Sequence, residues 1–380
     1  MSMSEEERHE LQGSLRHMLD RASSSEAVRS LLDDPLGHDS QLWRQLIELG
    51  YTSIHVPEEL GGAGASYGDL AVVLHELGRH LTPGPFFAHA VLATGALLAA
   101  DNVELKSELL PQLVAGERTG TVAVVNAGGS VEPDQMSMHW TDAGRGLRIS
   151  GTAAFVPDAH IADLVIVAAR GEDDEPLLAV VDIADPKVSV EPMTMVDLTR
   201  RVSTLVLDGV EVSRDQLLCE EGASTGPALE RVIALAAIAL MTDATGVAER
   251  VVEAAAEYAS ERMQFGRPIG SFQAVKHHCA NMLIATECSK AATAAGIEAL
   301  DDPTGDIRSA AAVVKSYVGP ACSSVAALGI GVHGGIGFTW EHDSHLFLKR
   351  TKLDEAWFGS PSWHRRRLVR SVLSTSGAEG

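Results

Sequence analysis

The residues best suited to holding a charged ligand lie in two short segments of the second half of the chain. Arg262 follows a long run with helical periodicity, and Gly266 and Pro268 then turn the chain. A fixed guanidinium beside exposed backbone amides suits a pyrophosphate. Gly334 and Gly335 remove side chains where a backbone must approach a ligand or another chain. Each segment also has a plain interpretation, as a helix cap for Arg262 and as a helix-ending turn for the glycines.

Few carboxylates in the apolar segments are placed to act as a base. Asp243 lies in the run ALAAIALMTDATG, where an acid needs a hydrogen-bonded partner or a chemical purpose. Glu230 is interpreted as a first-turn acid that the helix dipole favours. The cysteines are too far apart for a zinc or redox motif, so no metal site is expected; they are Cys219, Cys279, Cys288 and Cys322.

The composition describes an acidic, helix-rich protein. The 380 residues include 52 acidic and 30 basic side chains, and the net charge of -22 repels nucleic acid and anionic membranes. Hydrophobic residues make up 45% and aromatic residues 4%, so the core is expected to consist of Ala, Val and Leu in closely packed helices. The N-terminus lacks the apolar segment of a signal peptide, and no uninterrupted apolar stretch is long enough to span a membrane, so a cytoplasmic protein is expected.

The elements that must position these residues fall into three segments. Helical periodicity over residues 1–118 predicts an N-terminal helical domain. Short β-branched stretches such as TVAVVN, DLVIVAAR and STLVLDGVEV predict a middle β-barrel or sheet domain over residues 119–222. Residues 223–380 are predicted to form a C-terminal four-helix bundle, with long helices over 227–263, 272–300 and 307–328. The fold class is therefore α+β, mostly α, without the strand-helix alternation of a parallel sheet.

Three stretches, in this order, resemble the acyl-CoA dehydrogenase family. They are VPEELGGAG (Val56 to Gly64), ERMQFGRPIGSFQAVKHHCANM (Glu261 to Met282), which is similar to the family's RxQFGxPIxxFQ signature, and VHGGIGFTWEHDSHLFLKR (Val332 to Arg350), which is similar to its HGGxGF segment. The resemblance implies a tetrameric FAD enzyme that desaturates an acyl-CoA thioester, with a glutamate as base and an electron-transfer flavoprotein as electron acceptor. It also implies that FAD lies at a subunit interface, where the RxQFG and glycine segments of one subunit hold the adenine and pyrophosphate half of the neighbour's cofactor.

The resemblance assigns a set of cofactor-binding residues to this chain, namely Arg262, Gln264, Phe265, Phe272, Gln273, Gly331, Gly334 and Gly335. Among them, Gly331 stands where the family usually has a glutamine. The positions that the family places against the chain's own flavin are eroded instead. A threonine-glutamate pair is replaced by Val125 and Asn126, and a run of tryptophan, isoleucine and threonine or serine is replaced by Phe155, Val156 and Pro157.

The family's catalytic glutamate has two alternative positions, and this sequence fills neither. One position matches Phe358, and phenylalanine has no proton acceptor. The other lies ten residues before Gly246, where the chain has Ala236. Glu230 lies six residues too early, about 240° around the helix and about 9 Å along it. The catalytic residue is therefore unknown, and Asp243, which returns to nearly the same helical face as Ala236, is a weak candidate.

These losses favour a division of labour between subunits. We hypothesise that the chain belongs to a heterotetramer with two copies of each subunit, completes the FAD site of a second acyl-CoA dehydrogenase-like subunit, and lacks a base of its own. The stretches FVPDAH, VDLTRR and GFTWEHD resemble heteromeric actinobacterial members linked to steroid side-chain breakdown, which implies a steroid side-chain thioester as substrate. Three alternatives stay open: a self-sufficient dehydrogenase with Asp243 or Glu341 as a relocated base, a flavin monooxygenase on the same fold, and a purely structural or binding role without a flavin site. Arg200 and Arg201 either contact a partner or CoA phosphates, or are ordinary solvated residues.

Overall fold

The computed structural model describes residues 2–171, 175–219 and 224–376. Its contacts divide the chain into two compact units. The first unit comprises Met1–Ser2, Leu31–Ser66 and Pro83–Ala236, and the second comprises Met3–Ser30, Tyr67–Thr82 and Ala237–Gly380. The predicted domain boundaries at 118/119 and 222/223 stay predictions, and the second of them lies outside the described residues.

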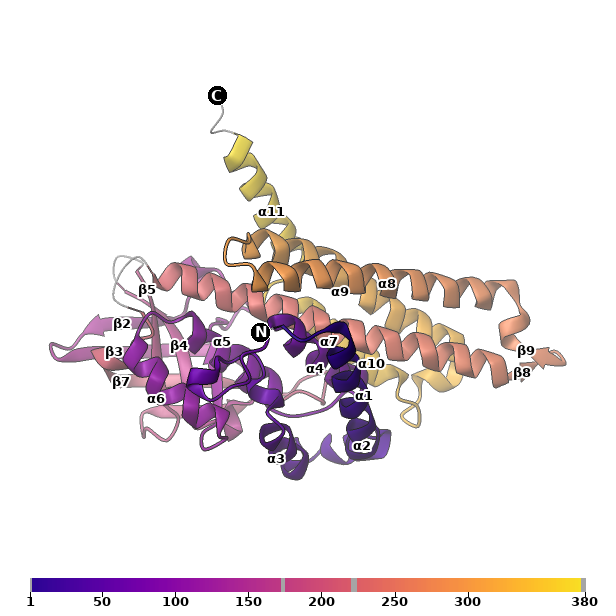
Figure 1. Ribbon diagram of the computed structural model, residues 1–380, viewed down its shortest axis with the longest axis horizontal. Helices are drawn as coiled ribbons and strands as arrows, with labels where there is room; N and C mark the ends of the chain where they lie inside the picture. Colours follow the sequence, from indigo (N-terminus) through magenta and orange to yellow (C-terminus); the bar gives the residue numbers. More distant parts are fainter. Residues whose placement is uncertain (1, 172–174, 220–223, 377–380) are drawn as a thin grey trace. The chain divides into compact units, whose positions relative to one another are not determined.

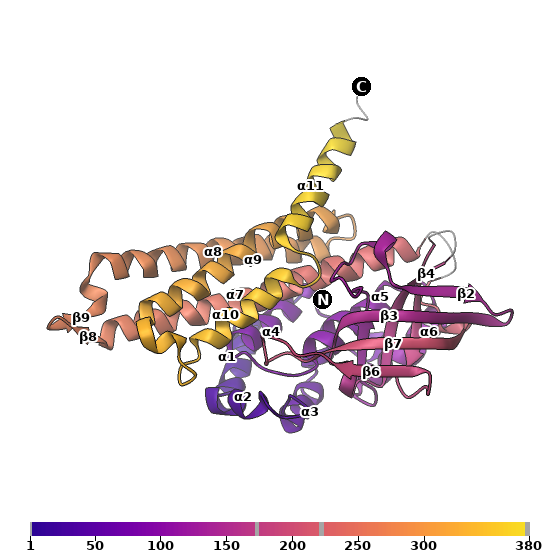
Figure 2. The same ribbon diagram turned by 180° about the vertical axis from the view of Figure 1, so that it is seen from behind.

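A seven-stranded sheet is the centre of the first unit (Figure 2), with the order β1-β4-β2-β3-β7-β6 and with β5 also paired to β4. Strand β4 runs parallel to β1 and β2, and the remaining pairs are antiparallel. Valine, leucine, isoleucine and alanine side chains form its core. The strands are β1 (Gly120–Ala123), β2 (Met138–Asp142), β3 (Gly146–Pro157), β4 (Leu164–Arg170), β5 (Pro176–Asp182), β6 (Val188–Pro192) and β7 (Val202–Ser213).

Short helices complete the first unit, and Arg201 fixes the segment that leads into them. Its guanidinium donates hydrogen bonds to the carbonyl oxygens of Leu31 at 3.1 Å and Leu32 at 2.8 Å, while Arg200 lies 5.1 Å over the ring of Phe87. The arginine pair therefore has a structural role within the unit. The helices are α3 (Ser40–Glu48), a π-helix (Phe87–Ala93) that continues into α5 (Thr94–Ala99), and α6 (Val103–Val114).

The second unit is a bundle of long helices. Figure 1 shows α7, α8, α9 and α10 running alongside one another, with the small β8–β9 hairpin at one end. The predicted fold class, α+β and mostly helical with a middle sheet and a C-terminal bundle, is confirmed. Its elements are α1 (Glu5–Ala22), α4 (Tyr67–Arg79), β8 (Met263–Gln264), β9 (Arg267–Pro268), α8 (Gln273–Asp301), α9 (Ile307–His333), α10 (Ser344–Ala356) and α11 (Pro361–Ser376). Most of α2 (Ser25–Leu31) and the part of α7 (Thr225–Glu261) that follows Ala236 also belong to this unit.

Helices α4 and α7 cross closely because each has a glycine at the crossing point. A Cβ atom added to Gly78 would lie 2.2 Å from the carbonyl oxygen of Asp243, and one added to Gly246 would lie 2.0 Å from that of His75. Any side chain at either position would force the helices apart. This crossing fixes the position of Asp243 within the bundle.

Two helices, α7 and α9, are long and apolar enough to cross a membrane when only length and composition are considered. Within the protein, 94% of the most apolar window of α7 and 50% of that of α9 are buried. Burial of this kind is typical of core helices of a bundle, so the two helices look like core elements.

Candidate functional site

The first predicted binding segment forms a tight hairpin at the end of α7. Gln264 pairs with Arg267 across the two strands, and the residues between them, Phe265 and Gly266, have φ angles of 52° and 77°. Two central residues with positive φ define a two-residue hairpin turn whose twist matches the flanking strands. The turn projects Phe265 away from the chain, with 90% of its surface exposed.

The side chains of this hairpin are held near one another but leave their polar groups available. The rings of Phe265 and Phe272 are 5.9 Å apart in an edge-to-face arrangement, and the Arg267 guanidinium lies 4.2 Å over the Phe272 ring. Three exposed polar side chains make no hydrogen bond or ion pair to any residue that the structure describes: Arg262, Gln264 and Gln273.

The second predicted binding segment follows the C-terminus of α9. Helix α9 ends at His333, whose ring centroid lies 4.6 Å from that of Tyr258 near the end of α7, so both segments lie at the same end of the second unit. A Cβ atom added at Gly331, Gly334 or Gly335 would meet no atom within 4 Å. The backbone there is open to a group from outside the chain.

Together the two segments form an exposed tip, which we define as Arg262–Gln273 and Gly331–Trp340. Its apolar side chains are unusually exposed, including Phe338 at 77% and Phe265 at 90%. Aromatic faces accept an adenine, a guanidinium and backbone amides accept a pyrophosphate, and open glycines permit close approach. The eight residues that the sequence assigned to FAD lie at the same end of the second unit, and their assignment to the cofactor stays a prediction.

Asp243, the weak candidate for a base, is held in a buried ion pair. Its carboxylate is 3.1 Å from a guanidinium nitrogen of Arg350 on α10, and the two residues are 3% and 1% exposed. Both carboxylate oxygens of Asp243 accept hydrogen bonds from the Arg350 guanidinium, at 3.1 and 3.4 Å. This arrangement fits a structural role between α7 and α10.

Phe358 occupies a loop whose backbone is tightly held. The residue has a φ angle of 53° and is buried, and its carbonyl oxygen is 3.0 Å from Nε2 of His364. Lys315 on α9, itself fully buried, donates hydrogen bonds from Nζ to the carbonyl oxygens of Asp354 and Trp357. Burial lowers the pKa of Lys315 to about 7, although the carboxylates of Asp354 and Glu355 favour its charged form.

The positions expected beside the chain's own flavin are occupied by local contacts in the first unit. The Asn126 side chain accepts hydrogen bonds from the backbone amides of Gly128 and Ser130, both at 2.9 Å, and donates one to the carbonyl oxygen of Gln135 at 2.7 Å. The side chains of Val125 and Val156 are buried and apolar. Ala236, at the other glutamate position, is fully buried and offers only a methyl group.

A buried polar cluster that the sequence analysis missed centres on Glu76 of α4. Its fully buried carboxylate receives hydrogen bonds from Arg16 at 2.6 and 2.9 Å and from Gln12 at 2.8 Å. Burial alone would raise the pKa of Glu76, but hydrogen bonds from His75, Arg16 and Gln12 outweigh burial and hold the pKa well below its usual value. The cluster lies beside a cavity of about 660 Å³ between α1, α4, α7 and α8. It ties α1 to α4.

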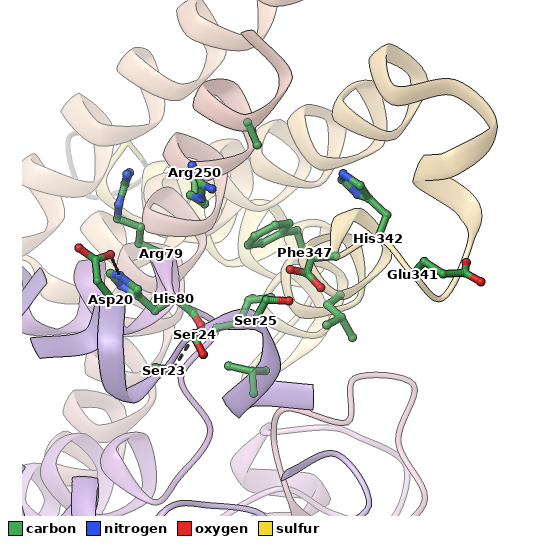
Figure 3. A pocket seen from close by; sticks show the side chains of 15 residues that line it. Asp20, Ser23, Ser24, Ser25, Arg79, His80, Arg250, Glu341, His342 and Phe347 are labelled. Carbon is green, nitrogen blue, oxygen red and sulfur yellow. Dashed lines mark hydrogen bonds and ion pairs between the residues drawn. The ribbon is translucent and has the colours of Figure 1, made fainter. Parts of the chain in front are cut away.

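A second cavity, of about 510 Å³, is bounded by α1, α2, α4, α7 and the start of α10 (Figure 3). Its charged groups are mostly paired: the Arg79 guanidinium binds Glu253, and the His80 ring is 3.0 Å from Asp20. Glu341, which sequence reasoning considered as a relocated base, lines this cavity, and the residue is exposed. No predicted cofactor residue lines this cavity in the part of the chain that the structure describes.

The fold, with its helical N-terminal part, middle sheet and C-terminal helices, is that of an acyl-CoA dehydrogenase. The sequence matches the acyl-CoA dehydrogenase N-terminal domain over residues 5–117 and the C-terminal domain over residues 227–373. It is 33% identical over 368 residues to the acyl-CoA dehydrogenase IpdE2 of Mycobacterium tuberculosis, an alignment that covers 97% of this chain and 98% of that protein. The chain belongs to the acyl-CoA dehydrogenase family, an FAD-binding family of oxidoreductases that act on acyl-CoA.

Two solved structures of heteromeric relatives superpose on almost the whole chain. A variant of the Tcur3481-Tcur3483 steroid ACAD aligns with a TM-score of 0.88 and 31% identity, and covers 99% of both chains. The ChsE4-ChsE5 complex from Mycobacterium tuberculosis aligns with a TM-score of 0.87 and 28% identity, and covers 98% of both chains. The chain is thus similar to subunits of complexes between different acyl-CoA dehydrogenase chains.

Proposed function

We propose that this chain is the partner subunit of a heterotetrameric, FAD-dependent acyl-CoA dehydrogenase, and that it completes the FAD site of a different, catalytic subunit. The reaction is the α,β-desaturation of an acyl-CoA thioester. A glutamate of the catalytic subunit would accept the α-proton, and bound FAD would supply the acceptor for the β-hydride, with an electron-transfer flavoprotein as the proposed electron acceptor. This chain holds the adenine and pyrophosphate half of that cofactor.

The single observation that carries the proposal is the contrast between the exposed tip and the positions expected for the chain's own chemistry. At the tip, Arg262, Gln264 and Gln273 are exposed and make no hydrogen bond or ion pair to the described residues, and the glycines are open. At the positions expected for a base, the chain has a buried alanine, a buried phenylalanine and an ion-paired Asp243. A subunit with this distribution can hold a neighbour's FAD and has no free carboxylate at the expected positions.

The steroid side-chain thioester is the proposed substrate of the complex. The Tcur3481-Tcur3483 complex, a steroid ACAD, is among the structures that cover almost the full length of the chain. The stretches FVPDAH and VDLTRR, which prompted the expectation, lie in the first unit, where Arg201 holds the segment around Leu31. Arg200 and Arg201 of the second stretch make contacts that shape the first unit.

The test uses a substitution that the chain itself tolerates. Gly335→Leu adds a side chain where no atom of the chain lies within 4 Å and where the backbone φ is not positive, so the chain is expected to fold as before. If FAD of a neighbouring subunit approaches this backbone, the co-expressed complex should lose most of its FAD. Gly13→Leu is the matched control, because Gly13 is equally open but lies on α1.

The readout is the ratio of 450 nm to 280 nm absorbance of the co-purified complex, together with turnover of an acyl-CoA substrate. We expect Gly335→Leu to lower both and Gly13→Leu to leave both unchanged. Full FAD content and turnover in the Gly335→Leu complex would reject the assignment of the tip. Turnover by this chain purified alone would favour the self-sufficient dehydrogenase instead.

A further inference from the structure

The segment that connects the glycine turn to α10 is held by an unusual contact of His342. The backbone amide of Ser344, the first residue of α10, donates a hydrogen bond to Nδ1 of His342 at 3.1 Å, and the Ser344 hydroxyl lies 2.7 Å from the same nitrogen. The helix has no side-chain hydrogen bond from its N-cap residue Asp343. His342 therefore performs the capping role, which normally belongs to a serine or aspartate oxygen.

This contact defines the protonation state of His342. A backbone N–H can only donate, so Nδ1 must be unprotonated and accept, and the ring must be neutral with its proton on Nε2. Protonation of Nδ1 would still allow a bond to the Ser344 hydroxyl oxygen, but it would leave the Ser344 amide without its acceptor. It would also place a positive charge at the positive end of the α10 dipole.

A positive charge on His342 is also disfavoured by the neighbouring ring of His333. The ring centroid of His342 lies 4.3 Å from that of His333, the last residue of α9. His333 donates from Nδ1 to the carbonyl oxygen of Gly329 at 2.7 Å, and its own ring lies between those of Tyr258 and His342. The two rings are tilted by 50° to each other, and at this distance the His333 ring disfavours a positive charge on His342.

The charged groups around His342 come from every neighbouring element and partly cancel. Arg29 of α2 opposes protonation, but its guanidinium is paired with Asp343 at 2.6 Å, which favours protonation. Burial, followed by His333, is the main reason why the pKa of His342 lies below its ordinary value. The groups that act on it are His333 of α9, Arg29 of α2, Asp343 of its own segment and His345 of α10. Arg250 of α7 and Glu341 line the same cavity, and Tyr258 of α7 lies on His333.

We propose that His342 is a proton-sensitive latch for the glycine turn: neutral His342 holds residues 334–343 against α9 and α10, and its protonation releases them. Figure 3 shows the latch segment, with His342 beside Glu341 and Phe347 at the edge of the cavity. Because Gly334 and Gly335 lie in the released segment, the latch regulates the cofactor contact, and this part of the inference rests on the proposed function. The complex should therefore lose FAD on mild acidification.

The latch is tested directly by amide hydrogen exchange in the full chain. Peptides covering residues 334–347 are compared at pH 7.5 and pH 5.0 after correction for the intrinsic exchange rate. Loss of one capping bond predicts exchange that is about fivefold faster at the lower pH. His342→Asn is the key variant, because its side-chain oxygen accepts from the Ser344 amide at every pH and does not titrate.

We expect the acid response in the wild type and in His17→Asn, which changes an exposed histidine of α1, and its absence in His342→Asn. An equal acid response in His342→Asn, or unchanged exchange in the wild type, overturns the latch. FAD retention in the complex is measured separately at both pH values. If the wild type exchanges faster in acid but keeps its FAD, the latch is supported and the cofactor role of the glycine turn is rejected. If the His342→Asn complex still loses FAD in acid, the latch alone is rejected.

Discussion

Replacement of Asp243 by asparagine tests whether this residue has a structural or a catalytic role. In the structure, the Asp243 carboxylate is 3.1 Å from the Arg350 guanidinium, and the pair is almost completely buried. Asp243→Asn keeps the shape of the side chain but leaves the Arg350 charge buried without this carboxylate. Breaking one side of a buried ion pair costs about 3 kcal/mol, which corresponds to roughly 6–12 °C in Tm for a unit of this size.

The double variant Asp243→Leu/Arg350→Met is the control, because replacement of a buried pair by apolar groups of similar volume is close to neutral. Urea denaturation of the full chain, followed by far-ultraviolet circular dichroism, should show a large loss of stability for Asp243→Asn and recovery of most of it in the double variant. Turnover of the folded complex should be retained in the double variant. Unchanged stability of Asp243→Asn together with complete loss of turnover would refute this reasoning and identify Asp243 as a base.

Three further outcomes follow from the same structure. The folded-state pKa of Lys315, about 7, is below its unfolded value, so unfolding takes up a proton above pH 7 and the stability of the protein rises with pH. In urea titrations between pH 7 and 9, the free energy of unfolding should increase by about 1 kcal/mol per pH unit relative to that of Lys315→Met. The folded-state pKa of Glu76 is depressed, so the stability that its charge contributes is present above pH 4.5 and is lost as the pH falls further. The wild type should be more stable than Glu76→Gln by about 2 kcal/mol at pH 7, and this difference in the free energy of unfolding should shrink below pH 4.5. A difference that stays constant would contradict the role of the Glu76 charge. Phe265→Ser should leave Tm unchanged because the ring is 90% exposed, yet weaken FAD retention in the complex, while Val103→Ser, at an exposed valine of the first unit, should affect neither.

The exposed tip could be predicted from sequence because its geometry is local. Arg262 and Gly266 follow one stretch of helical periodicity, and Gly334 follows another. Short-range sequence signals therefore place all three residues at helix ends. The bounds of α7 were predicted within two residues, as Pro227 to Met263 against the observed Thr225–Glu261. Family resemblance then supplied the information that the two helix ends belong to one binding segment.

The buried polar partners could not be predicted because they depend on contacts that are distant in the chain. Asp243 and Arg350 are 107 residues apart, and Lys315 is 39 residues from the carbonyl group of Asp354 that it binds. The sequence carried one signal for the second case: a lysine inside the apolar run AAAVVKSYV must bury its charge with partners. The strands β2 and β6 were also missed, since each has only five residues and its alternation of apolar and polar side chains covers too few positions to stand out.

The central claim, that this chain holds another subunit's FAD and carries no complete site, is tested most directly by native mass spectrometry with flavin quantification. The chain should be measured alone and after co-expression with a candidate catalytic subunit. We predict that the chain alone contains no FAD. After co-expression, we predict a heterotetramer with two copies of each subunit and two bound FAD molecules. One FAD per copy of this chain alone, with turnover of an acyl-CoA, would contradict it.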